Sequence, residues 1–253
     1  MGFLFRNEKA VAVQVAQPVQ AEVPQLQQAE IAAVYYGQRM GGDFYDFLRV
    51  SPSRVIFGLL DIAGRLDENR DIVTAAQQVF RNVASELLSG DDVNEANAMV
   101  ELCLQLNRSI MNAAAGVRSC PAFAGCYNEA LGTVCYFNAG HTPALLRDAE
   151  STEQLPATGL PLGLFSHATH DAPTVALEPG ASLLVVSRGI VESKCKSEEF
   201  GMERVESALQ RANFTSAREL CISVLSNVQQ FMCTPPTHND VTALALVRNR
   251  DQA

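Results

Sequence analysis

Residues 183–192 of the chain read Leu-Leu-Val-Val-Ser-Arg-Gly-Ile-Val-Glu. The first four are apolar, which predicts a buried strand, and the small residues Ser187 and Gly189 predict a turn at its end. A permanently charged side chain, Arg188, stands in that turn, and an acidic residue, Glu192, follows it. The strand end at Arg188 is therefore the first candidate site in the chain.

Five further short motifs flank this strand end in the sequence. They are Gly-Gly-Asp-Phe-Tyr-Asp at 41–46, Leu-Asp-Ile-Ala-Gly at 60–64, Asn-Ala-Gly-His-Thr-Pro at 138–143, Gly-Leu-Pro-Leu-Gly at 159–163 and Asn-Asp-Val-Thr at 239–242. Each is weak alone: the first, for example, lacks the glutamate of the Gly-Gly-Asp-Glu-Phe motif of nucleotide cyclases. Six motifs in one order between residues 41 and 242 are far more specific than any single one.

The hydrophobic pattern alternates between strand and helix periods along the chain. Strands are expected at 31–36, 44–50, 54–61, 122–127, 133–138, 144–147, 175–177, 182–186 and 241–247, and helices at 71–88, 94–115, 200–212 and 216–232. Strands and helices come in separate groups, without the strand-helix-strand repeat of a parallel sheet. The pattern therefore predicts an α+β fold in which helices cover antiparallel sheet.

Length and composition bound the class of protein. The chain has 253 residues and 47% hydrophobic content, which is enough for one sizeable domain. We expect a flexible N-terminal arm over residues 1–23, where Pro18 interrupts any helix, and one domain over 24–250. The net charge of −9 argues against general nucleic-acid binding, which needs a basic surface.

No apolar run is long enough to span a membrane, and the first residues are too short for a signal peptide. A cytoplasmic location is the default expectation. The seven cysteines form no Cys-x-x-Cys pair, so neither zinc-type spacing nor a secreted disulfide framework is expected. Most of them are predicted to be small apolar residues of the core.

The six motifs resemble those of the bacterial SpoIIE/RsbU-type branch of the PPM superfamily, the metal-dependent Ser/Thr protein phosphatases. The resemblance implies a four-layer α/β/β/α sandwich with two antiparallel sheets flanked by helices. It also implies two divalent cations, Mn or Mg, which carboxylates bridge and which activate the water that attacks a phosphoserine or phosphothreonine. Hard cations of this kind take oxygen ligands, and a pair of them stabilises attacking and leaving oxygens alike.

Two of the four matched acidic positions keep their aspartate. Asp43 matches the first acidic position and Asp61 the bridging aspartate, and Gly64 matches the glycine of the following loop. Arg188 stands where the family has a metal-binding aspartate in Thr-Asp-Gly or Ser-Asp-Gly. Asn239 stands where the family has the first aspartate of Asp-Asp-Ile-Thr, and its neutral carbonyl would only weaken a metal site.

The arginine is the graver change, because it alters the local charge by two units. At about 4 Å and an effective dielectric of about 20, each unit charge interacts by about 4 kcal/mol, and twice that against a dication. We expect the guanidinium of Arg188 to take the place of the cation and to pair with Asp61, Asp43 or both, so that Mn or Mg is absent or weakly bound. The alternative is that Arg188 extends into solvent. The loop at 64–70 has also lost the second glycine of the family.

These departures lead to three functional readings. The first is a pseudophosphatase or strongly impaired phosphatase that acts by binding in a bacterial partner-switching pathway, with a phosphorylatable antagonist of an anti-sigma factor as the partner class. The second is an active phosphatase that recruits substitute ligands, namely Asp46, Asp67, Glu192 or Asp240. The third is a scaffold subunit tethered by the N-terminal arm.

Two residues near these motifs also have simpler interpretations. His141 lies in a Gly-His-Thr-Pro turn, where a histidine more often holds the loop by hydrogen bonds than takes part in catalysis. Glu192, which matches a glutamate common in the family, would then only cap the segment that follows it.

Overall fold

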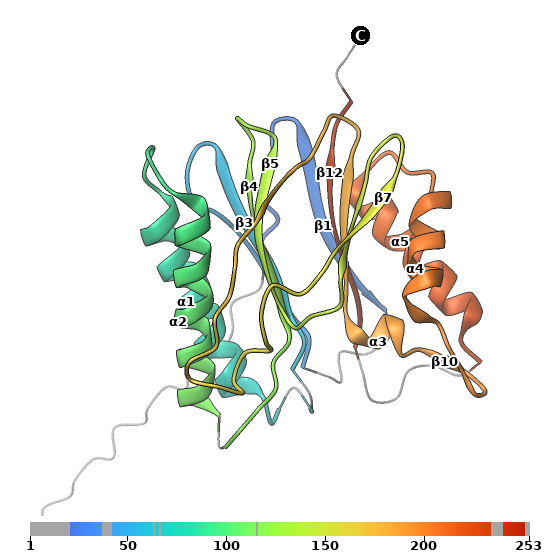
Figure 1. Ribbon diagram of the computed structural model, residues 1–253. Helices are drawn as coiled ribbons and strands as arrows, with labels where there is room; N and C mark the ends of the chain where they lie inside the picture. The colour runs from blue at the N-terminus through green and yellow to red at the C-terminus, as the bar shows by residue number, and fades with distance from the viewer. Residues whose placement is uncertain are drawn as a thin grey trace, which may run out of the picture.

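Two antiparallel sheets lie face to face between two pairs of helices (Figure 1). The computed structural model describes residues 21–36, 42–62, 64, 65, 67–114, 116–233 and 240–250. Within these residues the layers follow one another as helices, sheet, sheet and helices. The predicted α+β class and the four-layer α/β/β/α sandwich are therefore confirmed.

The first sheet has the strand order β2-β3-β4-β5-β8 and the second the order β1-β12-β9-β6-β7. The strands of the first sheet are β2 (Phe44–Arg49), β3 (Arg54–Leu60), β4 (Ala122–Asn128), β5 (Thr133–Ala139) and β8 (Thr174–Ala176). Those of the second are β1 (Ala29–Tyr36), β6 (Ala144–Arg147), β7 (Thr152–Leu155), β9 (Ser182–Val186) and β12 (Val241–Arg248). Every strand pairing within the two sheets is antiparallel.

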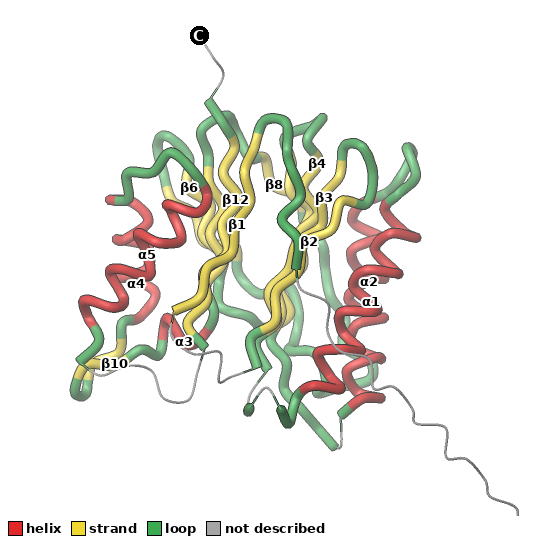
Figure 2. Tube along the Cα trace, turned by 180° about the vertical axis from the view of Figure 1, so that it is seen from behind, coloured by secondary structure: helices red, strands yellow, loops and turns green. Residues whose placement is uncertain are grey.

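Each sheet has its own pair of covering helices. Helices α1 (Arg70–Leu88) and α2 (Glu95–Ala113) pack on the first sheet, and α4 (Gly201–Arg211) and α5 (Ala217–Phe231) pack on the second. The view from behind shows the same separation of the two helix pairs on opposite faces (Figure 2). Two of these helices begin where a side chain caps them: Asn94 accepts from the amide of Asn97, and Ser216 from the amide of Glu219.

Four layers create three apolar cores, and strand β9 contributes to two of them. Leu183 and Val185 pack between the sheets, whereas Leu184 and Val186 face the helix layer. Because both faces are buried, the strand reads as a continuous apolar run although its sheet is antiparallel. Burying each such side chain contributes about 1.5 to 3 kcal/mol. The stretch 183–186 therefore holds the second sheet against both of its neighbours.

The predicted helices and long strands are all present, with ends that differ by one or two residues. The turn expected after β9 is instead the short helix α3 (Arg188–Val191), which opens with the arginine. Three short strands were not predicted: β7, and the two-residue strands β10 (Lys194–Cys195) and β11 (Glu198–Glu199). None of the three shows the alternation of apolar and polar residues that predicts a strand. β7 reads Thr-Glu-Gln-Leu at the edge of its sheet, and β10 and β11 have only two residues each.

Most of the cysteines lie in the core, as predicted. Five are buried and free, namely Cys103, Cys120, Cys126, Cys135 and Cys221. The other two form a disulfide, Cys195 to Cys233, which was not predicted. Residues 1–20 of the proposed arm lie outside the described residues, so the arm and the boundary at residue 24 stay predictions. None of the helices in the described part of the chain has the length and apolar character needed to cross a bilayer.

Candidate functional site

The residues singled out in the sequence meet at one end of the two sheets. Asp43 comes directly before β2 and Asp61 directly after β3, and the pairing of Phe44 with Leu60 brings these two strand ends together. In the second sheet Arg188 follows β9 by two positions and Asp240 directly precedes β12. Each sheet therefore supplies two of the charged residues, all of them from strand ends.

Three hydrogen bonds join the two sheets at this end. The amide of Arg188 donates to Oδ2 of Asp61 at 3.1 Å, and the amide of Asp43 donates to Oδ2 of Asp240 at 3.3 Å. The hydroxyl of Thr242 donates to Oδ2 of Asp43 at 2.7 Å. The carboxylates are thus held by protein donors from the facing sheet, and the site is formed only when the sheets are packed.

The side chain of Arg188 pairs with two carboxylates. Its Nη2 lies 3.6 Å from Oδ1 of Asp61, and its Nε lies 3.7 Å from Oε1 of Glu192, one helical turn further on. The side chain is 41% exposed, whereas that of Asp61 is 8% exposed. The expected pairing of Arg188 with Asp61 is present, and the guanidinium also reaches solvent.

Asp43 is a buried carboxyl in a crowded acidic environment. Burial, together with the charges of Asp61 and Asp240, raises its pKa from the ordinary 3.8 to about 8, although the hydroxyls of Thr242 and Ser187 oppose the shift. At neutral pH this carboxyl is therefore mostly protonated. A proton on Asp43 and the guanidinium of Arg188 together offset the repulsion among the three aspartates.

Burial and the charge of Arg188 also shift the pKa values of Asp61 and His141. Burial raises the pKa of Asp61, whereas the charge and the amide of Arg188 oppose that rise. Burial lowers the pKa of His141 to about 4, and the charge of Arg188 lowers it too. The ring Nδ1 of His141 lies within hydrogen-bonding distance of Thr142, and its amide donates to Asn138. His141 thus holds its loop, as predicted, and is neutral.

Two glycines let the backbone approach closely beside the aspartates. A Cβ on Gly42 would collide with the carbonyl oxygen of Ile62, next to Asp61. Gly64 has φ +108°, a conformation that L side chains rarely adopt. Gly42 and Gly64 are therefore required by the geometry of the backbone.

The structure separates Asp46 and Asp67 from this cluster. Asp46 is buried against α1, where both of its oxygens accept from Arg81 at 2.6 and 2.8 Å. Asp67 is exposed and pairs with Arg65 at 3.2 Å. Glu192 ends α3 and its carboxylate faces Arg188, so it does more than cap the next segment. Asn239 lies outside the described residues.

Two hydroxyl residues complete the site and were not singled out from the sequence. The hydroxyl of Ser187 donates to the carbonyl of Asp240 at 3.1 Å and accepts from the amide of Thr242 at 3.0 Å. It thereby joins the end of β9 to the start of β12. Ser187 and Thr242 both lie inside motifs quoted from the sequence. Their positions next to Arg188 and Asp240 could have marked them as site residues. Among the described residues, no group of three or more His, Cys, Asp or Glu side chains is arranged to hold a metal ion.

Comparison with known proteins places this geometry in a family. The family model described as Stage II sporulation protein E (SpoIIE) matches residues 52–249. The chain is 22% identical over 248 residues to Protein IcfG of Synechocystis sp., covering 90% of this chain and 39% of that protein. It is 25% identical over 167 residues to phosphoserine phosphatase RsbP of Bacillus subtilis, covering 65% and 40%. The chain thus spans about two fifths of the length of these relatives.

Solved structures share the fold at low sequence identity. The PP2C phosphatase domain of SpoIIE from Bacillus subtilis matches with a TM-score of 0.73 and 13% identity, covering 89% of this chain and 64% of that one. The RsbU and RsbW domains of Rv1364c from Mycobacterium tuberculosis match with a TM-score of 0.71 and 23% identity, covering 91% and 63%. RsbX, solved in complex with magnesium, matches with a TM-score of 0.61 and 14% identity, covering 91% and 100%. The fold is that of the PPM phosphatases.

Proposed function

The chain belongs to the SpoIIE family, and we propose that within it this protein is a pseudophosphatase or a strongly impaired phosphatase that acts by binding another signalling protein. The family membership supplies the phosphatase fold and the class of partner. The altered strand ends of the second sheet supply the loss of activity.

The contact between Arg188 and Asp61 carries this proposal. The family resemblance implies that Asp61 corresponds to the carboxylate that bridges two cations. Here its Oδ2 accepts the amide of Arg188 and its Oδ1 lies 3.6 Å from the guanidinium. A permanent positive charge in contact with the bridging carboxylate opposes the approach of a dication. The arginine thereby neutralises the site without a metal.

The chemistry of the donor set supports the same conclusion. A dinuclear centre needs several ionised carboxylates with oxygens free to coordinate. Oδ2 of Asp43 accepts the hydroxyl of Thr242, and Oδ2 of Asp240 accepts the amide of Asp43, so both carboxylates already accept protein donors. The guanidinium of Arg188 lies against the third carboxylate, that of Asp61. This donor set does not favour a dinuclear Mn or Mg centre.

The proposed partner is a phosphorylatable antagonist of an anti-sigma factor or a related switch protein. The partner class comes from the family resemblance alone. It agrees with the matched RsbP, whose name describes a phosphoserine phosphatase, and with the matched chain that carries RsbU and RsbW domains. A protein with this fold and a blocked site would hold such a partner without dephosphorylating it.

One observation favours the alternative, an active phosphatase with substitute ligands. Asp240 bonds to the amide of Asp43, and its charge acts on both Asp43 and Asp61, so a third carboxylate stands close to the retained pair. In this alternative Asp240 takes over the role of the missing ligand at position 239. A cation would then have to displace Arg188 from Asp61.

Metal titration and phosphatase assays on the purified chain test the proposal. We expect calorimetry with Mn²⁺ or Mg²⁺ up to millimolar concentration to give no binding heat, and a phosphoserine peptide to remain intact in the presence of Mn²⁺. RsbP, assayed side by side, serves as the active relative. Hydrolysis at a comparable rate overturns the proposal of a pseudophosphatase and supports the alternative of an active phosphatase. Binding heat without hydrolysis narrows the defect to catalysis and contradicts the displacement of the cation by Arg188.

A further inference from the structure

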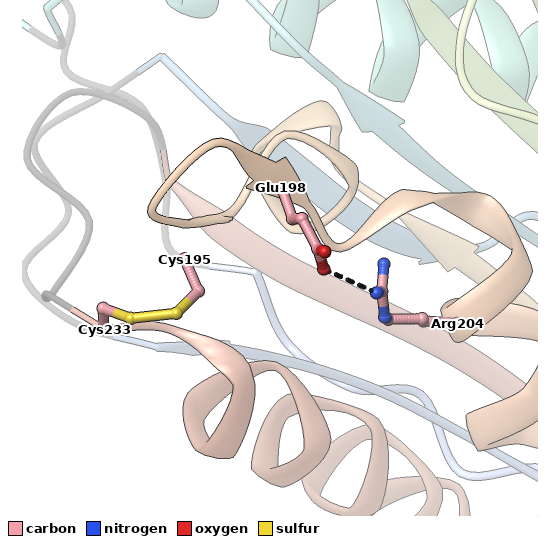
Figure 3. Close-up of a disulfide and its surroundings, with 4 residues drawn as sticks. All are labelled: Cys195, Glu198, Arg204 and Cys233. Atoms are coloured by element: carbon pink, nitrogen blue, oxygen red, sulfur yellow. Dashed lines mark hydrogen bonds and ion pairs between the residues drawn. A yellow bond between two sulfur atoms is a disulfide. The ribbon is translucent and has the colours of Figure 1, made fainter.

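The disulfide between Cys195 and Cys233 connects the two segments that flank the altered half of the site. Cys195 lies in β10, seven positions after Arg188, and Cys233 follows α5, seven positions before Asp240. The Cα atoms are 4.8 Å apart, within the range of protein disulfides. Figure 3 shows the bond beside the β10–β11 hairpin and the end of α5.

The disulfide closes a covalent loop of residues 195–233, and Arg188 and Asp240 lie seven positions outside it on either side. At the site the hydroxyl of Ser187, next to Arg188, donates to the carbonyl of Asp240 and accepts from the amide of Thr242. The pairing of β9 with β12 also joins the two segments there. The disulfide adds a covalent link between the continuations of these segments, so opening it removes one of the connections that hold them in register.

Few other contacts hold the hairpin to α5. The ring of Phe200 packs edge-on against that of Phe231 at 5.4 Å, and the guanidinium of Arg204 lies 4.8 Å from the centre of the same ring. Arg204 also pairs with Glu198 of the hairpin at 3.1 Å, a contact between two largely exposed side chains (Figure 3). Such exposed pairs are weak. The disulfide is thus the covalent link of this corner, beside these noncovalent contacts.

Accessibility singles out this pair among the cysteines. Cys233 is exposed and Cys195 is partly exposed, whereas the five free cysteines are buried. Burial raises the pKa of those five thiols, so they hold little thiolate at neutral pH. Thiol chemistry in solution can therefore act on one position of the described chain without touching the core.

We propose that the Cys195–Cys233 disulfide is a redox-responsive clamp, which a protein dithiol of the thioredoxin class opens to loosen the strand ends that carry Arg188 and Asp240. This regulation rests on the proposed binding function, because it sets how firmly the binding site is held. In a reducing compartment, disulfides of intracellular proteins are commonly transient or redox-sensing.

The exchange reaction is balanced by the dithiol. One thiolate of the reductant attacks the exposed sulfur of Cys233, the bond between the two cysteine sulfurs breaks, and Cys195 leaves as a thiolate that takes up a proton. The second thiol of the reductant then attacks the mixed disulfide and releases Cys233. The reductant ends as a disulfide, and two electrons and two protons have passed to the protein.

Hydrogen exchange on the full chain, oxidised and reduced with dithiothreitol, tests the clamp. We expect amides of 187–200 and 240–242, including the Arg188 amide that donates to Asp61, to exchange at least tenfold faster after reduction. Amides of α1 serve as the internal control and should not change. Native alkylation with iodoacetamide should label Cys195 and Cys233 only after reduction.

Variants separate the clamp from general effects of the reductant. The double variant Cys195→Ser with Cys233→Ser should exchange like the reduced chain and ignore dithiothreitol. Cys221→Ala, which alters a buried cysteine of α5, should keep the full response. If either variant fails to fold, the reduced wild-type chain still gives the comparison.

Two outcomes overturn the clamp. The first is free Cys195 and Cys233 thiols in protein treated with oxidised glutathione, because then the bond does not form. The second is a bond that forms while the Arg188 and Asp240 amides exchange at the same rate in both states. Metal titration and phosphoserine hydrolysis are run on the same oxidised and reduced samples. They test the pseudophosphatase proposal independently of whether the clamp is supported or overturned.

Discussion

The two sheets have kept different parts of the site. The first sheet supplies Asp43 and Asp61 from the ends of β2 and β3, both as the family pattern predicts, together with the glycines that their backbones require. The second sheet supplies Arg188 after β9, and the sequence before β12 carries Asn239. The two predicted positions that keep an aspartate thus lie on the first sheet, and the two predicted to have lost one follow β9 and precede β12 in the second. An apolar core lies behind each sheet.

This contrast shows that packing and chemistry are under separate constraints. The core residues of β9 and β12 hold the second sheet between its neighbours whether or not a metal is present. Arg188 does not contribute to this packing, because it lies beyond Val186, the last residue of β9 that pairs with β12. A sheet can therefore keep its fold and exchange an aspartate for an arginine at its end.

The largest effect, a gain in Mn²⁺ affinity, is expected when the second sheet is given aspartates at positions 188 and 239. The variant Arg188→Asp with Asn239→Asp restores two carboxylates and removes the guanidinium. Each unit charge near the site is worth about 4 kcal/mol at close range. We expect Mn²⁺ to bind at least about 1,000-fold more tightly than to the wild-type chain, as measured by calorimetry.

The control for this double variant is Arg204→Asp, which makes the same charge exchange at the β10–β11 hairpin, where Arg204 pairs with Glu198. It should gain no affinity for Mn²⁺. If the double variant gains none either, the obstacle is not the ligand set, and the rebuilt loop at 64–70 becomes the defect to test next.

A smaller effect is expected from Asp43→Asn on the first sheet. The folded-state pKa of Asp43 is raised to about 8, above its ordinary 3.8. The stability that its protonated form contributes is therefore fully present below pH 3.8 and is lost as the pH rises to about 8. Asparagine does not titrate, so the variant should be more stable than the wild type at pH 9 and about equal to it at pH 3.5.

Urea unfolding at several pH values measures this difference. Millimolar Mn²⁺ in a parallel series distinguishes the two proposed functions. A wild-type chain that binds the cation through Asp43 is stabilised by it, and the asparagine variant then loses its advantage. A pH-independent difference between variant and wild type contradicts a buried, protonated Asp43.

The smallest effects come from comparing Arg81 of α1, the helix that packs on the first sheet, with Arg188 of α3, which follows β9 of the second sheet. Arg81 pairs with Asp46, whose side chain is 1% exposed, so Arg81→Met leaves a buried charge without its partner and should cost about 3 kcal/mol. Arg188 is 41% exposed and lies 3.6 Å from Asp61, so Arg188→Met should cost less than about 1 kcal/mol. Urea unfolding at pH 7 checks both, with unchanged m-values as the condition for comparing them. Equal losses contradict the view that Arg188 belongs to the site and not to the framework.

The sequence predicted the framework well, because long elements have a period of their own. The apolar spacing of α1 and α2 and the uninterrupted run of β9 are local properties of the chain, and all three elements lie within two residues of their predicted ends. The edge strand β7 has no such pattern, because only its pairing with β6 makes it a strand. The helix α3 was missed for a related reason, since four residues are too few to show a helical period.

The candidate site was predicted as a set of residues and not as a set of contacts. Asp43, Asp61 and Arg188 follow from the motifs. That Asp46 is engaged by Arg81, and that Ser187 and Thr242 tie the strand ends together, depends on which faces of the strands meet. These partners are 35, 53 and 199 positions apart, and partners so distant leave no trace in the local pattern.

The sequence alone indicated the class of the fold and the family, and it predicted that two acidic positions are replaced, because periodicity, motif order and residue identity are properties of the chain itself. Only the tertiary structure decided that the guanidinium of Arg188 rests against Asp61, that Asp43 is buried where its carboxyl keeps a proton, and that Cys195 and Cys233 meet. These three facts depend on distances between segments of two packed sheets. Packing sets those distances, and packing also sets the burial on which the charge of each group depends.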